Sequence, residues 1–137
     1  MKFEQPRREI LFEGFNVEQI LSLPNEQIEA LVLTGESNVF RIGSATILGE
    51  FKITENRLII ELAQIEQGGE GVLPALSSLS RRFATIRRLT AIEWIVHAVH
   101  CGHPNLKLRR VLVKRGFVIQ DVPGSGEAYH FIDCLDV

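Results

Sequence analysis

Three histidines and one cysteine lie within seven residues, at His97, His100, Cys101 and His103. Imidazole and thiol groups can transfer protons or bind zinc, so this cluster could support either chemistry. On an extended strand His97 and Cys101 share one face and His100 points to the other, because side chains alternate. At most three of the four could then converge, so we expect no metal. Two alternatives stay open, a catalytic or substrate-contact role and ordinary residues at a strand end.

A glycine-rich turn, Gln67-Gly68-Gly69-Glu70-Gly71, stands directly before an amphipathic segment. The N-terminus of a helix presents unpaired backbone N–H groups and partial positive charge, which together accept a pyrophosphate. Glycines remove the side chains that would keep phosphate oxygens away from those N–H groups. The turn is therefore a candidate phosphate site, although a tight connection without a ligand can have the same composition.

A second signature combines Asn105 with Gly116 and Phe117, which follow eleven and twelve residues later. Asparagine is a good N-cap, and its amide can instead reach a ligand. A glycine in the left-handed conformation commonly ends a helix. The spacing predicts a helix that begins after Asn105 and ends at Gly116, so that Phe117 folds back onto the core.

The stretch from Gln67 to Phe117 resembles the acyl-CoA-binding half of the GNAT N-acetyltransferase family. Gly69 and Gly71 fall on the glycine positions of its Gln/Arg-x-x-Gly-x-Gly/Ala motif, with Glu66 at the first position. The resemblance implies that an amine attacks acetyl-CoA, the co-substrate, directly in a ternary complex. It also implies the residues that contact the CoA, which are Ile65, Gly68, Gly69, Gly71, Val72, Leu73, Asn105 and Arg109.

The resemblance also suggests where the amine loses its proton. In the family the strand that ends near His97 borders a cleft where it separates from its neighbour, so His97 or His100 could face the acyl group. An amine such as lysine has a free pKa of about 10.4, so the reaction needs a base. Glu61, Gln64 and Glu93 are the other candidates on the neighbouring strands, and the sequence does not choose among them.

Leu112 stands where many members of the family keep a tyrosine that protonates the leaving thiolate. Leucine cannot donate a proton, and loss of a positioned acid costs roughly 10²–10⁴-fold in rate. The candidate substitutes are Tyr129, the only tyrosine, and a histidine of the cluster at His97, His100 and His103. The alternative is a catalytically inactive GNAT-fold protein that binds CoA or regulates another protein.

A third interpretation starts from charge. Residues 81–115 carry a large excess of Lys and Arg over a single Glu93, whereas the whole chain has a net charge of −2. Such a segment indicates an anionic ligand or polyanion. Base stacking would need aromatic residues among the arginines, and Phe83 and Trp94 are expected in a helix and a strand instead. A nucleic-acid partner is therefore disfavoured.

Hydrophobic periodicity places these residues on elements. Strands are predicted at Ile10–Phe12, Val39–Ile42, Thr46–Ile53, Leu58–Ile65, Ala91–Cys101, Phe117–Val122 and Tyr129–Leu135, and Ala30–Thr34 is expected to be extended. Helices are predicted after Asn16, over Val72–Leu89, and from Pro104 and Asn105 onward, where Leu108, Val111 and Leu112 should face inward. The fold class is therefore α/β (α+β), a GNAT-like mixed, mostly antiparallel sheet with helices on both faces. One parallel strand pair, Leu58–Ile65 with Ile92–Val99, should surround a βαβ unit.

In the Val72–Leu89 helix, apolar residues recur at spacings of four, three, four and three, which predicts one buried stripe. The stripe consists of Val72, Leu76, Leu79, Phe83 and Ile86. Arg81, Arg82 and Arg88 should stay in water.

Composition sets the wider expectations. The 137 residues are 45% apolar and 23% charged, which suits one globular domain over 1–137. No apolar run approaches the roughly 20 residues of a membrane helix, and the N-terminus has no apolar signal segment. We therefore expect a cytoplasmic protein without a membrane partner, in which Cys101 and Cys134 are free thiols. A homodimer is left open, and the amine substrate is not identified.

Overall fold

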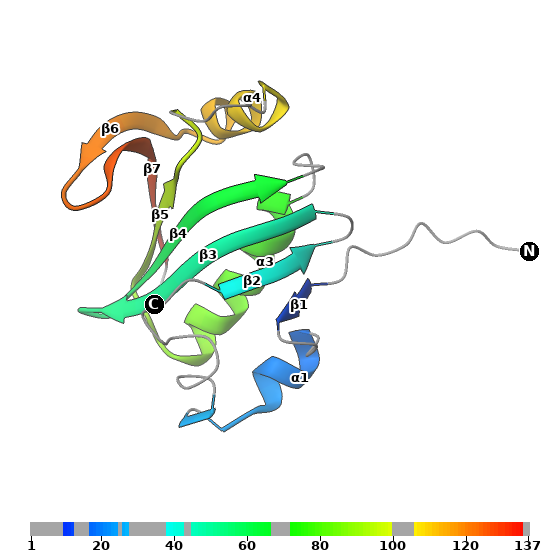
Figure 1. The fold of residues 1–137 in the computed structure, drawn as a ribbon. Coiled ribbons are helices and arrows are strands. Elements are labelled where there is room, and N and C mark those ends of the chain that lie inside the picture. The colour runs from blue at the N-terminus through cyan, green and yellow to red at the C-terminus, as the bar shows by residue number, and fades with distance from the viewer. Residues whose placement is uncertain are drawn as a thin grey trace, which may run out of the picture.

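The computed structural model describes residues 10–12, 17–24, 26–27, 38–42, 45–66, 72–99 and 106–135. The elements, shown in Figure 1, are β1 (Ile10–Phe12), α1 (Val17–Ser22), β2 (Asn38–Ile42), β3 (Ala45–Thr54), β4 (Arg57–Glu66), α3 (Val72–Ile86), β5 (Ala91–Val96), α4 (Leu106–Lys114), β6 (Val118–Val122) and β7 (Gly126–Cys134). The expected segment Ala30–Thr34 lies outside the described residues. Within the described residues, no helix has the length and hydropathy that crossing a bilayer requires.

The strands that the structure describes form one seven-stranded sheet in the order β1-β2-β3-β4-β5-β7-β6. Every neighbouring pair is antiparallel except β4 and β5, which pair in parallel from Arg57↔Ala91 to Leu62↔Val96. Parallel neighbours need a crossover, and α3 supplies it. The predicted fold class is confirmed in its mixed sheet and its single parallel pair around a βαβ unit.

The main core lies between the sheet and the helices α3 and α4. Alternate residues of the parallel strands, among them Ile60 and Trp94, form one buried cluster with Leu76 of α3 and with Leu108 and Leu112 of α4. β5 and β6 are both antiparallel to β7, so α4 is a second crossover in the same direction as α3. Crossovers of the same hand lie on the same face, so α3 and α4 cover the same face of the sheet. The helices that the predicted fold class places on the other face remain a prediction.

The buried stripe of α3 was predicted correctly except at its end. Leu76 and Phe83 are buried, Leu79 is half-buried, and the side chain of Val72 is not described. Ile86 is 59% exposed, so its predicted burial is wrong, and the helix ends there instead of continuing to Leu89.

The chain leaves α3 through Arg88, which has a positive φ of 57°. The N–H of Leu89 donates to the carbonyl of Ala84 at 2.8 Å and that of Arg88 to Thr85 at 3.2 Å, the hydrogen bonds of a Schellman motif. Leu89 therefore turns back into the core, where it is 5% exposed, and occupies the place that the stripe assigned to Ile86.

The end of α4 follows the sequence prediction. Gly116 has a φ of 94°, and the N–H of Phe117 donates to the carbonyl of Leu112 at 3.0 Å. Phe117 is buried, and its ring centroid lies 5.2 Å from that of Phe131 on β7. The predicted inward face of α4 is confirmed by Leu108 and Leu112, which are buried, and by half-buried Val111.

Two strand boundaries differ from the prediction. β5 ends at Val96, five residues before Cys101, because the N–H of Ala98 already turns back to the carbonyl of Val96. β7 begins at Gly126, three residues before Tyr129, because a tight turn closes the hairpin. In that turn the N–H of Ser125 donates to the carbonyl of Val122 at 2.9 Å, and Gly124 has a φ of 81°.

Candidate functional site

The parallel strands β4 and β5 separate at one end. Their pairing stops at Leu62↔Val96, and the N–H of His97 makes the last bridge, to the carbonyl of Leu62 at 2.9 Å. β4 continues to Glu66 without a partner on the described part of β5. β4 also bulges here, since Leu48 pairs with Gln64 but Gly49 pairs with Leu62. An extra residue in β4 bends the strand, so the opening is built into its register.

An imidazole and a carboxylate meet beside this opening. His97 Nε2 lies 2.6 Å from Glu61 Oε2, and the two side chains are 27% and 23% exposed. A carboxylate only accepts hydrogen bonds, so the neutral histidine donates through Nε2 and keeps a lone pair on Nδ1. The Glu61 carboxylate thereby fixes the tautomer of His97 and leaves its Nδ1 able to accept a proton. Of the candidate catalytic residues, the structure brings these two together.

A second charged cluster lies on the same face of the sheet, one row further from the opening. Glu93 accepts a hydrogen bond from Arg57 Nη1 at 2.8 Å and pairs with His130 Nε2 at 2.8 Å. Burial raises the pKa of Glu93, but the hydrogen bonds from His130 and Arg57 outweigh it and hold the pKa below its ordinary value. A carboxylate with a lowered pKa and two partners is a weak base, so this arrangement favours Glu61 and His97 over Glu93.

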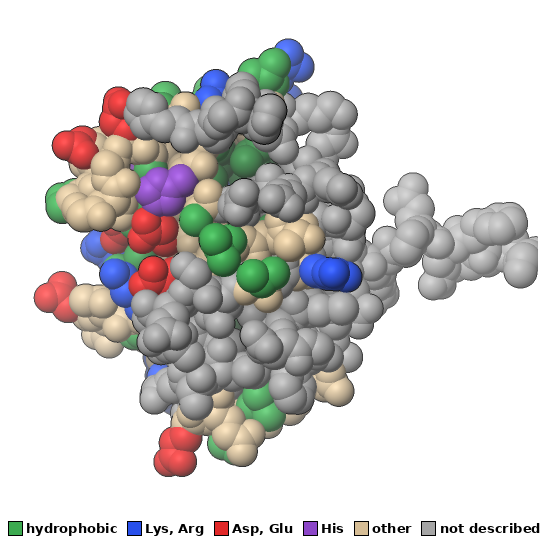
Figure 2. Space-filling model, viewed as in Figure 1, with side chains coloured by type: hydrophobic (Ala, Val, Ile, Leu, Met, Phe, Trp, Pro, Cys, Tyr) green, Lys and Arg blue, Asp and Glu red, His purple; other side chains and the backbone are tan. Residues whose placement is uncertain are grey.

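Figure 2 shows a histidine beside acidic side chains on the face of the molecule turned to the viewer. The register explains why such groups gather, because Glu61 lies opposite Ile95 and Ile95 opposite His130. Side chains that are paired across neighbouring strands share a face. The described residues contain no group of three or more His, Cys, Asp or Glu placed to hold a metal ion.

Tyr129 lies level with the opening but on the other face of the sheet. It pairs with Val96, the last residue of β5, and is 6% exposed within the main hydrophobic cluster. Leu112, at the position of the family's tyrosine, is fully buried in the same cluster. Tyr129 and His97 therefore lie at the same end of the β4–β5 pairing, on opposite faces of the sheet.

The predicted CoA contacts are described in part. Leu73 is buried in the first turn of α3, Val72 is the first residue of that helix, and Ile65 belongs to β4. Arg109 donates from Nε to the carbonyl of Ala98 at 2.8 Å and from Nη2 to that of Val99 at 2.9 Å. It therefore ties α4 to the segment after β5. The remaining predicted residues, Gly68, Gly69, Gly71, His100 and Asn105, lie outside the described residues.

Several arginines of the basic segment are engaged within the protein. Arg81 makes a bidentate pair with Asp133, at 2.9 Å from Nε and 2.8 Å from Nη2. Arg82 pairs with Glu18 at 3.1 Å, and the guanidinium of Arg87 lies 5.6 Å from the centre of the Phe83 ring. These contacts engage three arginines of the segment within the protein, and the expectation against nucleic acid stays a prediction.

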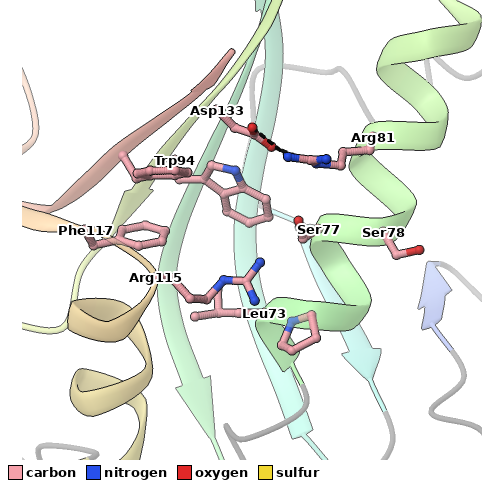
Figure 3. Close-up of a pocket in the computed structure, with 10 residues that line it drawn as sticks. Leu73, Ser77, Ser78, Arg81, Trp94, Arg115, Phe117 and Asp133 are labelled. Atoms are coloured by element: carbon pink, nitrogen blue, oxygen red, sulfur yellow. Dashed lines mark hydrogen bonds and ion pairs between the residues drawn. The ribbon is translucent and has the colours of Figure 1, made fainter. Parts of the chain in front are cut away.

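Sequence reasoning missed a cavity between α3 and the strands β5 and β7. Its volume is about 590 Å³, and α3 lines it with Leu73, Ser77 and Arg81, while Trp94 and Arg115 face it from β5 and the end of α4. Figure 3 shows the guanidinium of Arg115 reaching toward α3, with the Trp94 ring beside it. The strand alternation placed Trp94 on this face, but no motif marked a cavity there.

Comparison with known proteins finds weak similarity to solved structures at low identity. No protein-family model and no curated protein sequence matches the chain. Among solved structures, it is similar to the PaiA N-acetyltransferase from Thermoplasma acidophilum in complex with coenzyme A, with 17% identity and a TM-score of 0.40 over 66% of this chain. It is also similar to the NatC complex bound to Gag peptide and CoA, with 16% identity and a TM-score of 0.40 over 69% of this chain. The chain spans 53% and 63% of those two chains.

Proposed function

We propose that this chain is an acetyl-CoA-dependent N-acyltransferase that acts on an amine by direct attack in a ternary complex. The observation that carries the proposal is the Glu61–His97 pair, placed where the parallel strands β4 and β5 separate. A base oriented by a carboxylate is what an amine nucleophile requires near neutral pH. The resemblance of residues 67–117 to the GNAT family supplies the reaction class.

The N-terminus of α3 is where the proposal places a phosphate group. Leu73, in its first turn, is buried with 1% exposure, which packs this turn on the sheet. In the sequence the helix follows β4 and the glycine-rich segment. Backbone N–H groups at such a helix end can bind a pyrophosphate. Acetyl-CoA would supply the activated acyl group as a thioester. The proposal assigns its phosphates to this end of α3 and its acyl end to the opening beside Leu62.

In the proposed reaction His97 Nδ1 takes the proton of the attacking amine. The Glu61 carboxylate holds the ring through Nε2 and stabilises the positive charge that the ring gains. A proton must also reach the leaving thiolate, and we assign that role to Tyr129, which lies level with the opening at Val96. Base and acid then act from opposite faces of the sheet.

The test measures thiol release from acetyl-CoA against a panel of primary amines. His97→Asn should lower kcat/KM by about 10²–10⁴-fold, the usual loss for a positioned base. Glu61→Gln should lower it less, because the ring keeps a hydrogen bond but loses the charge that stabilises it. His130→Asn is the matched control, since His130 pairs with Glu93 instead. Equal rates for His97→Asn and the unmutated protein would refute the assignment.

A second candidate is a CoA-binding protein without turnover, and the observation that favours it is Leu112. Its side chain is fully buried among apolar residues, so no polar group replaces the family's tyrosine at that position. CoA at a hundred times its dissociation constant should raise the free energy of unfolding by about 2.7 kcal/mol under either candidate. Gly71→Asp should remove that stabilisation by adding a carboxylate where phosphate would bind. Stabilisation without thiol release for any amine would select this second candidate.

A further inference from the structure

The cavity beside α3 has the composition of a small-molecule site. Its volume of about 590 Å³ lies within the range of about 300–1,000 Å³ that ligand pockets occupy. Three aromatic rings line it, from Trp94 on β5, Phe117 directly before β6 and Phe131 on β7. The Phe117 and Phe131 rings lie 5.2 Å apart at an interplanar angle of 30°. Flat apolar walls of this kind favour a planar aromatic ligand.

The polar side chains of the cavity give it a net positive charge. The two arginines that line it are Arg81 and Arg115, and the acidic residue is Asp133. Asp133 is neutralised by the bidentate contact with Arg81, and its side chain is 12% exposed. Arg115 makes no side-chain hydrogen bond or ion pair within the described part of the chain, and its guanidinium extends over the cavity in Figure 3. One cation is thus available to an anionic group.

A serine hydroxyl of α3 adds hydrogen-bonding capacity. Ser80 and Thr85 donate to carbonyls four residues earlier on the helix. Ser77 and Ser78 line the cavity, and neither makes that bond or another side-chain hydrogen bond among the residues that the structure describes. A carboxylate held by Arg115 can accept a hydrogen bond from Ser77, which points toward Trp94 in Figure 3, whereas Ser78 points away from the cavity.

We propose that this cavity binds a planar aromatic carboxylate, held by Arg115 and stacked among Trp94, Phe117 and Phe131. The cavity shares Leu73 in the first turn of α3 with the proposed phosphate site, but its aromatic walls lie on the other face of the sheet from the Glu61–His97 pair. Trp94 pairs with Ile60, two residues before the parallel pairing ends, and faces away from Glu61 and His97. The proposal therefore does not depend on the acyltransferase function.

The chain offers a direct reporter for this site. Trp94 is the only tryptophan, so ¹⁵N-labelled protein gives a single indole N–H signal. We would titrate the full chain with 2-naphthoate and, separately, with the neutral 2-naphthamide. The expected result is a saturable shift of the indole signal, with about tenfold tighter binding of the carboxylate, as a charge-assisted hydrogen bond provides.

Arg115→Gln should weaken naphthoate binding about tenfold and leave naphthamide binding unchanged. Arg110→Gln is the matched control, because Arg110 is an exposed arginine of the same helix that does not line the cavity. Saturating CoA should leave the naphthoate affinity unchanged. The proposal is overturned if neither compound gives a saturable shift, if Arg115→Gln weakens both equally, or if CoA displaces naphthoate. Displacement would assign the cavity to the nucleotide end of CoA.

Discussion

Replacing Glu93 with glutamine tests whether the half-buried charge cluster on β5 stabilises the fold. The carboxylate has two hydrogen-bonding partners, Arg57 at 2.8 Å and His130 at 2.8 Å. A hydrogen bond to a charged group contributes about 1.5–3 kcal/mol when it is shielded from water. The Arg57 side chain is 42% exposed and the His130 side chain 11%, so the Arg57 contact counts for less. Glutamine keeps the shape and one neutral hydrogen bond, and we expect the free energy of unfolding to fall by about 1–2 kcal/mol at pH 7.

The same substitution should change how stability depends on pH. The pKa of Glu93 lies below its ordinary value of 4.5 in the folded protein, since the hydrogen bonds from His130 and Arg57 outweigh burial. A carboxylate whose pKa is lowered by folding contributes stability above its unfolded pKa, and loses it as pH falls through the folded pKa. Glutamine does not titrate. The difference between the two proteins should therefore shrink as pH falls below 4.5.

Urea unfolding at pH values from 7.5 down to 3.5 measures both effects. Glu50→Gln is the matched control, because Glu50 lies opposite Glu61 on the same sheet and has no ion pair among the described residues. It should cost nothing, because like charges directly opposite each other repel and the substitution removes one of them. A Glu93→Gln deficit below about 0.5 kcal/mol at pH 7, or one that does not shrink in acid, would refute the reasoning.

Five further substitutions test the fold by their effect on the free energy of urea unfolding. Phe83→Ala should cost about 3–5 kcal/mol, because the ring is buried, whereas Ile86→Ala, at an exposed position, should cost less than about 0.5 kcal/mol. Gly116→Ala should cost about 1 kcal/mol because φ is 94°, and Arg88→Gly should be neutral or stabilising because φ is 57° at a residue with a Cβ. Arg109→Met should cost about 1–2 kcal/mol, since two carbonyls lose their guanidinium donor. Equal costs for Phe83→Ala and Ile86→Ala would contradict the burial of Phe83, and equal costs for Gly116→Ala and Arg88→Gly would contradict the backbone argument. No cost for Arg109→Met would contradict its two hydrogen bonds.

The sequence predicted the central βαβ unit because each of its signals is local. The apolar spacing of α3 and the β-branched runs of β4 and β5 lie within single elements, and a helix between neighbouring strands requires a parallel pair. The left-handed residue at Gly116 was predictable for the same reason, since few other residues adopt that conformation without strain.

Two features could not be predicted, the exit from α3 and the contact between Glu61 and His97. Burial of Leu89 in place of Ile86 follows from a helix end in which Arg88, not glycine, takes the left-handed conformation. Hydrophobic periodicity predicts a longer helix wherever apolar residues recur at helical spacing, and it does not show that a non-glycine residue ends the helix. The sequence named Glu61 and His97 as separate candidates, but their contact joins residues 36 positions apart and depends on the register of β4 with β5.

Strand β5 connects the two proposed sites through its alternation. Glu93 and Ile95 lie on the face that carries Glu61 and His130, whereas Trp94 lies on the other face and lines the cavity beside α3. His97 follows the last pair of the strand and closes the end of the β4–β5 ladder through its N–H. A one-residue slip of β5 would therefore exchange these side chains between the faces and disrupt the Glu61–His97 pair and the cavity together. The two sites are distinct in chemistry, but they depend on the same register, and the parallel β4–β5 pairing is the feature on which both proposals rest.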